Sequence, residues 1–207
     1  MNYKVGALQK LHLKPVVEVH LKAFPGFFLS FLGPKFLTEF YQSFIEDDAG
    51  IGFVGQDALT GQVVGVIVGP LVPAGYFKRL LKKKWWAFCL ASLTAVLKKP
   101  SVIPRLFRAV FYRGESPASM EGLALLSSIA VSPDVQAKGL GGVLVQAFME
   151  EVKRRGGNGV FLTTDADHND KVNRFYQKLG FSMESSHVTP EGRKMNRYVL
   201  MFNDGKI

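Results

Sequence analysis

The sequence predicts a mixed α/β (α+β) fold in which a central sheet of about seven strands carries four helices. First, strand-like and helix-like segments follow one another in the order β-α-α-β-β, an insertion, and β-α-β-α-β-β. Second, a glycine-rich turn joins a buried strand to a helix in the second half of the chain. Third, 47% of the 207 residues are hydrophobic, which is ample for one packed core. We therefore expect a single domain over residues 1–207, with an insertion at 71–117.

The first half of the chain predicts three strands and two helices. Apolar residues at helical spacing, followed by Pro25-Gly26, indicate the first helix. Pro34 suits the first turn of the second helix. The expected elements are a strand at 3–8, a helix at 11–24, a loop at 27–33, a helix from Pro34, and two β-branched strands at 51–55 and 63–68.

The second half predicts four strands and two helices. Lys153, Arg154 and Arg155 stand in the last turn of the longer helix, and Gly156 follows them, as expected for a helix C-terminus. Asn169 or Asp170 can cap the shorter helix. The expected elements are a buried strand at 122–131, a helix from Leu140 to Val152, a strand at 159–164, a helix at 172–179, and hairpin strands at 181–188 and 195–202.

The net charge of +9 arises in the insertion, because the interval between Asp57 and Glu115 contains basic residues and no acidic residue. Around a stretch of thirteen uncharged residues, 85–97, the insertion carries lysines at both ends and begins with two Trp. The stretch is too short to span a membrane, which takes about 20 apolar residues. We expect a helix that packs on the domain with solvated lysines; the alternatives are a peripheral contact of 78–113 with an anionic membrane, a homodimer contact, and a lid over a nucleotide sugar. Nucleic acid is not favoured, since the rest of the chain is close to neutral.

Three further observations narrow the class of protein. The lone Cys89 cannot form an intramolecular disulfide, and no signal peptide opens the sequence, which favours a cytoplasmic location, with the inner face of the membrane as the alternative. Four scattered His show no metal-ligand spacing, so no metal is expected.

The turn after Val131 has the composition of an anion site. Glycines let the backbone approach an anion closely, and the start of a helix leaves N–H groups unpaired. A tightly packed turn is the plainer interpretation. A dinucleotide fold would need a third glycine where the chain has Leu144.

The segment Gln136-Ala-Lys-Gly139-Leu-Gly141 resembles the Q/R-x-x-G-x-G/A motif of the GNAT N-acetyltransferases, and it lies between strand and helix as in that family. The resemblance implies the GNAT fold and an acetyl-CoA (or another short acyl-CoA) cofactor whose pyrophosphate binds the backbone of 137–142. The residues that it implies at the cofactor are Ile129, Ala130, Val131, Gln136, Ala137, Lys138, Gly139, Leu140, Gly141, Gly142, Asn169, Asn173 and Tyr176.

A second segment, from Asn169 to Phe181, is similar to the family's N-x-x-(A/V)-x-x-F-Y-x-x-x-G-F signature. By this resemblance Tyr176 is the general acid that protonates the departing thiolate, because a free thiolate leaves poorly. A core aromatic beside Phe175 is the alternative. The resemblance also implies that one backbone N–H near Ser127 to Ala130 stabilises the oxyanion. Covalent catalysis by Ser127 or Ser128 is not favoured, because neither has the G-x-S-x-G context.

The general base and the acceptor stay open. Asp165, His168 and His20 are base candidates, and a water chain is the alternative. The loop after the first helix is similar to that of GNAT proteins linked to surface-polysaccharide biosynthesis. This implies an amino sugar on a nucleotide or lipid carrier, ahead of a small-molecule or peptide amine. The expected substrate-binding residues are His20, Phe24, Phe27, Phe28 and Ser127. A non-catalytic acyl-CoA-binding module and a membrane-recruited adaptor are the non-enzyme alternatives.

Overall fold

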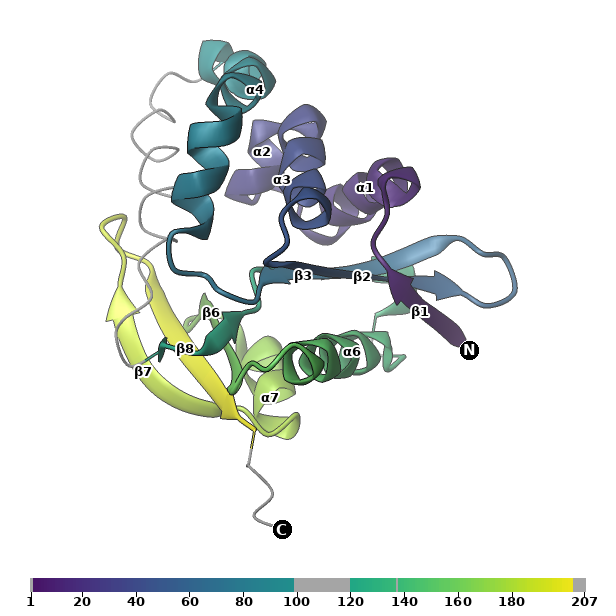
Figure 1. Cartoon of the computed structure of the whole chain (residues 1–207), viewed down its shortest axis with the longest axis vertical. Coiled ribbons are helices and arrows are strands. Elements are labelled where there is room, and N and C mark those ends of the chain that lie inside the picture. Colours follow the sequence, from purple (N-terminus) through teal and green to yellow (C-terminus); the bar gives the residue numbers. More distant parts are fainter. Residues whose placement is uncertain (1, 99–119, 137, 203–207) are drawn as a thin grey trace.

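Two four-stranded sheets form the framework of the protein (Figure 1). The structure is a computed structural model that describes residues 2–98, 120–136 and 138–202. The first sheet has the order β1-β2-β3-β5 and is antiparallel throughout. The second has the order β4-β6-β8-β7, in which only the β4–β6 pair is parallel. The strands are β1 (Tyr3–Ala7), β2 (Gly50–Asp57), β3 (Val63–Pro70), β4 (Leu123–Leu125), β5 (Ser128–Val131), β6 (Gly159–Asp165), β7 (Ser182–Val188) and β8 (Lys194–Met201).

Helices cover both faces of the first sheet, as Figure 1 shows. One face carries α1, α2, α3 and α4, the other carries α6, and α7 lies against the second sheet. Because side chains alternate along a strand, β3 serves both sides: Val66 and Val68 pack with α1 and α3, while Ile67 packs with α6. The helices are α1 (Leu13–Ala23), preceded by a short 3-10 turn (Lys10–His12), α2 (Phe28–Leu32), α3 (Pro34–Glu46), α4 (Tyr76–Lys98), α6 (Leu140–Arg154) and α7 (Asp170–Lys178).

The strand predicted at 122–131 is two strands in different sheets. The Leu126 N–H donates to the Phe161 carbonyl of β6 at 2.9 Å, whereas the next N–H, of Ser127, donates to the Val68 carbonyl of β3 at 3.0 Å. The chain therefore changes sheets between these two residues. An apolar run looks the same whichever strand it pairs with, so the sequence pattern could not reveal this change.

The loop predicted at 27–33 was wrong, because residues Phe28–Leu32 form the short helix α2. Phe28, Leu29 and Leu32 pack on the core between the first sheet and its helices, and this packing stabilises a helix too short to be marked by periodicity. Gly33 ends it with a φ of +92°, a conformation that favours glycine.

The described part of the basic insertion is α4, which packs on the core beside α2 and α3. Its residues Tyr76, Phe77, Phe88 and Ala91 are buried there, so one side of this helix packs on the domain. Residues 99–119, including Lys99, Arg105, Arg108 and Arg113, lie outside the described residues. No helix within the described ranges is long and apolar enough to cross a membrane.

Lys84 differs from its exposed neighbours Lys82 and Lys83, although the sequence grouped all three as solvated. Its Nζ lies 2.6 Å from Glu46 and 3.4 Å from Glu39 of α3, at a kink where its φ is −131°. Burial alone would lower the pKa of Lys84, but the hydrogen bond and charges of Glu46 and Glu39 outweigh it and raise the pKa. Lys84 therefore fastens α4 to α3.

Candidate functional site

The edge of β5 that faces away from β3 pairs with no other strand in the part of the chain that the structure describes. β5 is the last strand of the first sheet, and the Ser132 N–H donates to the Val64 carbonyl of β3 at 2.8 Å. Backbone groups point alternately to either side of a strand, so the N–H and C=O groups of Ile129 and Val131 point away from β3. The Gln136 side chain supports this direction, because its Nε2 donates to the Val131 carbonyl at 3.2 Å.

The first turn of α6 offers a second group of N–H donors. Gly139 precedes the helix in the left-handed conformation, with a φ of +88°, and its carbonyl accepts the N–H groups of Gly142 at 3.1 Å and Val143 at 3.3 Å. The N–H groups of Leu140 and Gly141 bond to no residue that the structure describes. A Cβ on Gly139 would project into open space. Two donors and the positive end of the helix dipole thus face that space.

The loop between β5 and α6 is fixed by hydrogen bonds of its own side chains. Lys138 Nζ donates to the Asp134 carbonyl at 2.9 Å, and Ser132 Oγ donates to the Asp134 carboxylate at 3.2 Å. Ala137, one of the expected cofactor contacts, lies outside the described residues.

Tyr176 lies on α7 and is 5% exposed. Its ring contacts Phe175, Phe181 and Tyr198, with centroids 5.1, 5.7 and 6.2 Å away. Burial raises the pKa of the Tyr176 phenol well above its usual range. The same hydrophobic cluster includes Ile129 and Val131 of β5, so the phenol belongs to the core that borders the open strand edge. A phenol that stays protonated can donate a proton but cannot act as a base.

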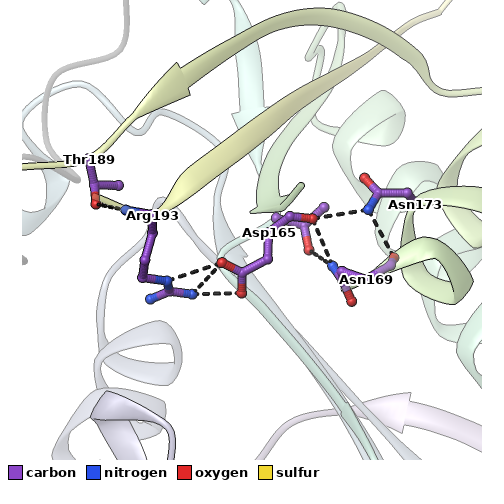
Figure 2. Close-up of polar contacts among 6 residues, drawn as sticks. Asp165, Asn169, Asn173, Thr189 and Arg193 are labelled. Atoms are coloured by element: carbon purple, nitrogen blue, oxygen red, sulfur yellow. Dashed lines mark hydrogen bonds and ion pairs between the residues drawn. The ribbon is translucent and has the colours of Figure 1, made fainter. Parts of the chain in front are cut away.

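Asn173 is the centre of a hydrogen-bond network that joins α7 to the second sheet (Figure 2). Its Nδ2 donates to the carbonyls of Asp165 at 3.0 Å and Asn169 at 2.9 Å. Its Oδ1 accepts from the Tyr198 hydroxyl at 3.0 Å and from Asn196 at 3.1 Å. Both hydrogens and both lone pairs are therefore used within the chain.

Asn169 fixes the end of β6 in the same network. Its Nδ2 donates to Thr164 Oγ1 at 2.9 Å and to the Asp165 carbonyl at 3.0 Å. Its side-chain carbonyl is the part that remains for a ligand in this arrangement.

The two loop candidates for the base differ in their surroundings. The Asp165 carboxylate forms a bidentate ion pair with Arg193 (Figure 2). Arg193 Nε lies 3.1 Å from Oδ1, and Nη2 lies 2.7 Å from Oδ1 and 2.6 Å from Oδ2. His168 is exposed between β6 and α7 and has a φ of +54°. The Asp165 carboxylate is therefore already engaged by a guanidinium within the chain.

Aromatic side chains at the end of α1 and in the turn between α1 and α2 form a row on the other side of the first sheet. The ring centroids of His20 and Phe24 are 5.0 Å apart, and those of Phe24 and Phe27 are 5.2 Å apart. His20 is buried and Phe27 is exposed, so the row runs from the core to the surface; Phe28 packs on the core instead. Among the described residues, the buried Ser127 Oγ has no hydrogen-bond partner.

Tyr41 of α3 is a residue that the sequence did not single out. Its hydroxyl hydrogen-bonds His20 Nδ1 at 2.7 Å, and both side chains are buried. Nothing in the spacing could have paired them, because they lie 21 residues apart and meet only through the packing of α1 on α3.

No candidate metal site is present in the described residues. Over 2–98, 120–136 and 138–202, no three His, Cys, Asp or Glu side chains form a group that could hold a metal ion.

Comparison with protein families gives one match over most of the chain. The model of the family described as "Acetyltransferase (GNAT) family" matches residues 15–181.

Comparison with solved structures shows the same fold. The ribosomal-protein-S18-alanine N-acetyltransferase from Escherichia coli is 15% identical, with a TM-score of 0.59 over 100% of this chain and 99% of that chain. Mutant forms of the spermidine/spermine N-acetyltransferase from Vibrio cholerae are 14% identical, with a TM-score of 0.57 over 97% of this chain and 95% of that chain. Arabidopsis thaliana NAA60 in complex with acetyl-CoA is 12% identical, with a TM-score of 0.60 over 98% of this chain and 99% of that chain. The fold class expected from the sequence is thereby confirmed.

Proposed function

The chain belongs to the acetyltransferase (GNAT) family of acetyl-CoA-dependent N-acetyltransferases, and we propose that the open edge of β5 and the first turn of α6 together form its acetyl-CoA site. One observation carries this proposal. Four backbone N–H groups, those of Ile129, Val131, Leu140 and Gly141, face outward from two adjoining elements.

Each group of donors suits one part of the cofactor. The N–H groups of Leu140 and Gly141, at a helix N-terminus, suit the pyrophosphate. The strand edge at Ile129 and Val131 suits the amides of the pantetheine arm and the thioester carbonyl, whose oxygen gains negative charge during attack. Ala130 is left out of this proposal, because its N–H points to β3.

Side chains around these donors act mainly by holding the backbone. Gln136 and Lys138 fix the loop through the carbonyls of Val131 and Asp134. Asn173 positions α7, and the side-chain carbonyl of Asn169 is the contact that we retain for the cofactor. Acetyl-CoA supplies the activated acetyl group and a thiolate leaving group. Tyr176, protonated and buried, donates its proton to that sulfur.

The acceptor is a primary amine, and we propose an amino sugar. Phe24 and Phe27, which lead from the core to the surface, offer ring faces of the kind that pack on sugar rings. The neighbouring structures favour a second candidate class of acceptor, since their names give spermidine or spermine and an alanine of a ribosomal protein. Ser127 Oγ, buried and unpartnered among the described residues, is a hydrogen-bonding group for either acceptor.

Thiol release from acetyl-CoA tests the function and ranks the acceptors. The panel contains a nucleotide-linked amino sugar, free glucosamine, spermidine and an Ala-Gly dipeptide. We expect amine-dependent thiol release, fastest with an amino sugar. If spermidine or the peptide is turned over faster, that amine replaces the amino sugar as the proposed acceptor. If acetyl-CoA binds but no amine causes thiol release, the result supports a non-catalytic module.

The exposed face of α4 supports a second proposal, a peripheral contact with the anionic inner face of the membrane. Trp85 and Trp86 are 61% and 58% exposed, and Leu90 is exposed beside them. Among the residues of α4 whose burial the structure describes, 76–92, the exposed cations are Lys78, Arg79, Lys82 and Lys83. Indole rings at headgroup depth with lysines around them are typical of interfacial helices.

We expect salt-sensitive binding to phosphatidylcholine vesicles that contain phosphatidylglycerol. Each lysine near such a surface contributes about 1 kcal/mol, so replacing Lys82 and Lys83 by Gln lowers the partition coefficient roughly 30-fold. Lys84 is left unchanged because it pairs with α3. The matched control replaces Lys14 and Lys35, exposed on α1 and α3, and should have little effect. The membrane contact is contradicted if the protein stays in the supernatant with vesicles at low salt. It is also contradicted if the Lys82/Lys83 variant and the Lys14/Lys35 control lose vesicle binding equally.

A further inference from the structure

A chain of three polar side chains crosses the core between α1, α3 and β5. His20 is 2% exposed and Tyr41 is fully buried. The Tyr41 hydroxyl hydrogen-bonds His20 Nδ1 at 2.7 Å. Burial raises the pKa of the Tyr41 phenol well above its usual range, and a side-chain hydrogen bond with Ser128 partly opposes this rise. The phenol therefore stays protonated and stands between an imidazole and a serine hydroxyl.

The outer end of this chain lies at the proposed acetyl site. Ser128 is half-buried and is the first residue of β5. The next residue, Ile129, presents its N–H to the open edge where the thioester carbonyl is proposed to bind. Ala130, which alternates with Ile129, packs in the core of α1 and α3. Ser128 lies on that same face, because side chains two apart share a face of a strand.

A second buried tyrosine in this core, Tyr76, shows a hydrogen bond that only satisfies its hydroxyl. Tyr76 is also fully buried, and its hydroxyl lies 3.3 Å from Ser43 Oγ. Ser43 donates in turn to the Phe40 carbonyl of its own helix at 2.7 Å, so that chain ends on the backbone. The chain through Tyr41 instead joins a titratable group to the strand edge.

N-acetylation needs a proton acceptor, because a primary alkylamine is largely protonated at neutral pH and cannot attack as an ammonium ion. Of the base candidates, Asp165 is paired with Arg193. We propose that Ser128, Tyr41 and His20 form a proton path that takes the proton of the acceptor amine to the buried imidazole. This path rests on the proposed acetyltransferase function and supplies the base that it lacks.

The proton transfers balance without any further reactant. The ammonium gives one proton to Ser128 Oγ, the Ser128 proton moves to the Tyr41 oxygen, and the Tyr41 proton moves to His20 Nδ1. The free amine then forms the C–N bond as the C–S bond breaks, and the sulfur takes the proton of Tyr176. The remaining surplus proton on nitrogen restores Tyr176 through water. His20 returns its proton along the path to solvent after the product leaves.

Ser128 is the member that contacts the amine, whereas Tyr41 and His20 act through it. Tyr41→Phe keeps the ring and removes the link. His20→Asn keeps an acceptor for the Tyr41 hydroxyl but cannot take a proton. Tyr76→Phe is the matched control, because it removes a buried hydroxyl from the same core without touching the path.

Two amines of nearly equal size separate a proton path from a packing effect. Ethylamine is largely protonated at neutral pH, and 2,2,2-trifluoroethylamine is largely unprotonated. We expect Tyr41→Phe and His20→Asn to lower kcat/KM for ethylamine by about 100-fold, the lower end of general-base contributions. With trifluoroethylamine, which needs no base before attack, the loss should be much smaller. The affinity for coenzyme A and the melting temperature serve as checks on folding.

Each outcome decides the proposal. A loss confined to ethylamine in both variants, with Tyr76→Phe close to the wild type, supports the path. Equal losses with both amines, or no loss with either, overturn it and leave Tyr41 and His20 as core residues. If the wild type releases thiol with neither amine and with no member of the acceptor panel, the proposed function itself fails, and the path with it.

Discussion

Replacing Tyr176 by Phe is expected to lower the turnover by about 10- to 1000-fold, around the contribution of a general acid. The ring and its contacts with Phe175 and Phe181 remain, so the core keeps its packing. What disappears is the proton for the departing sulfur. Because the proposed cofactor contacts are mainly backbone N–H groups elsewhere, the affinity for coenzyme A should change little. Single-turnover kinetics with acetyl-CoA measure the chemical step directly.

Tyr198→Phe is the control for this change. Tyr198 is buried in the same cluster and donates to Asn173 at 3.0 Å, so its loss should reduce stability rather than chemistry. Because burial raises the pKa of Tyr176, the acid stays protonated as the pH rises through the usual tyrosine range. The rate should therefore show no fall there from loss of this proton. An unaltered single-turnover rate in Tyr176→Phe makes Tyr176 a core aromatic and nothing more.

Replacing Gly139 by Ala is expected to weaken the binding of coenzyme A by about 10- to 100-fold, the effect of losing one hydrogen bond to a charged group. An L-residue in the left-handed conformation costs about 1–2 kcal/mol, so the cap relaxes and moves the N–H groups of Leu140 and Gly141. The added Cβ also projects into the open space where the pyrophosphate is proposed to lie.

Gly156→Ala is the matched control at the other end of the same helix. Gly156 has a φ of +80°, and a Cβ there also meets nothing within 4 Å. The two variants should therefore lose similar stability, while only Gly139→Ala loses affinity in calorimetry with coenzyme A. Equal affinities in both variants contradict the pyrophosphate assignment.

Much of the fold could be predicted because burial leaves a periodic trace in the sequence. Leu140, Leu144, Phe148 and Val152 recur every four residues, and all four are buried on one face of α6. Gly139 could be singled out for a similar reason, since its left-handed conformation favours one residue type.

The rest depends on which segments meet, and periodicity does not record that. The run at 122–131 is apolar except for Ser127 and Ser128, yet its pairing is split between β3 and β6, and this split creates the open edge of the site. The pairing of Asp165 with Arg193 crosses from β6 to the end of the β7–β8 hairpin, and it changes a base candidate into a paired carboxylate. The contact between His20 and Tyr41 likewise exists only once α1 packs on α3.

Amide chemical shifts during a titration with coenzyme A test the central claim most directly, because the proposed site is made of backbone N–H groups. The largest changes should fall on Ile129, Val131, Leu140 and Gly141, with smaller changes on Ala130, whose N–H faces β3. In Gly139→Ala the changes at Leu140 and Gly141 should shrink most. Saturable binding that leaves these four amides unchanged and shifts others instead would contradict the site.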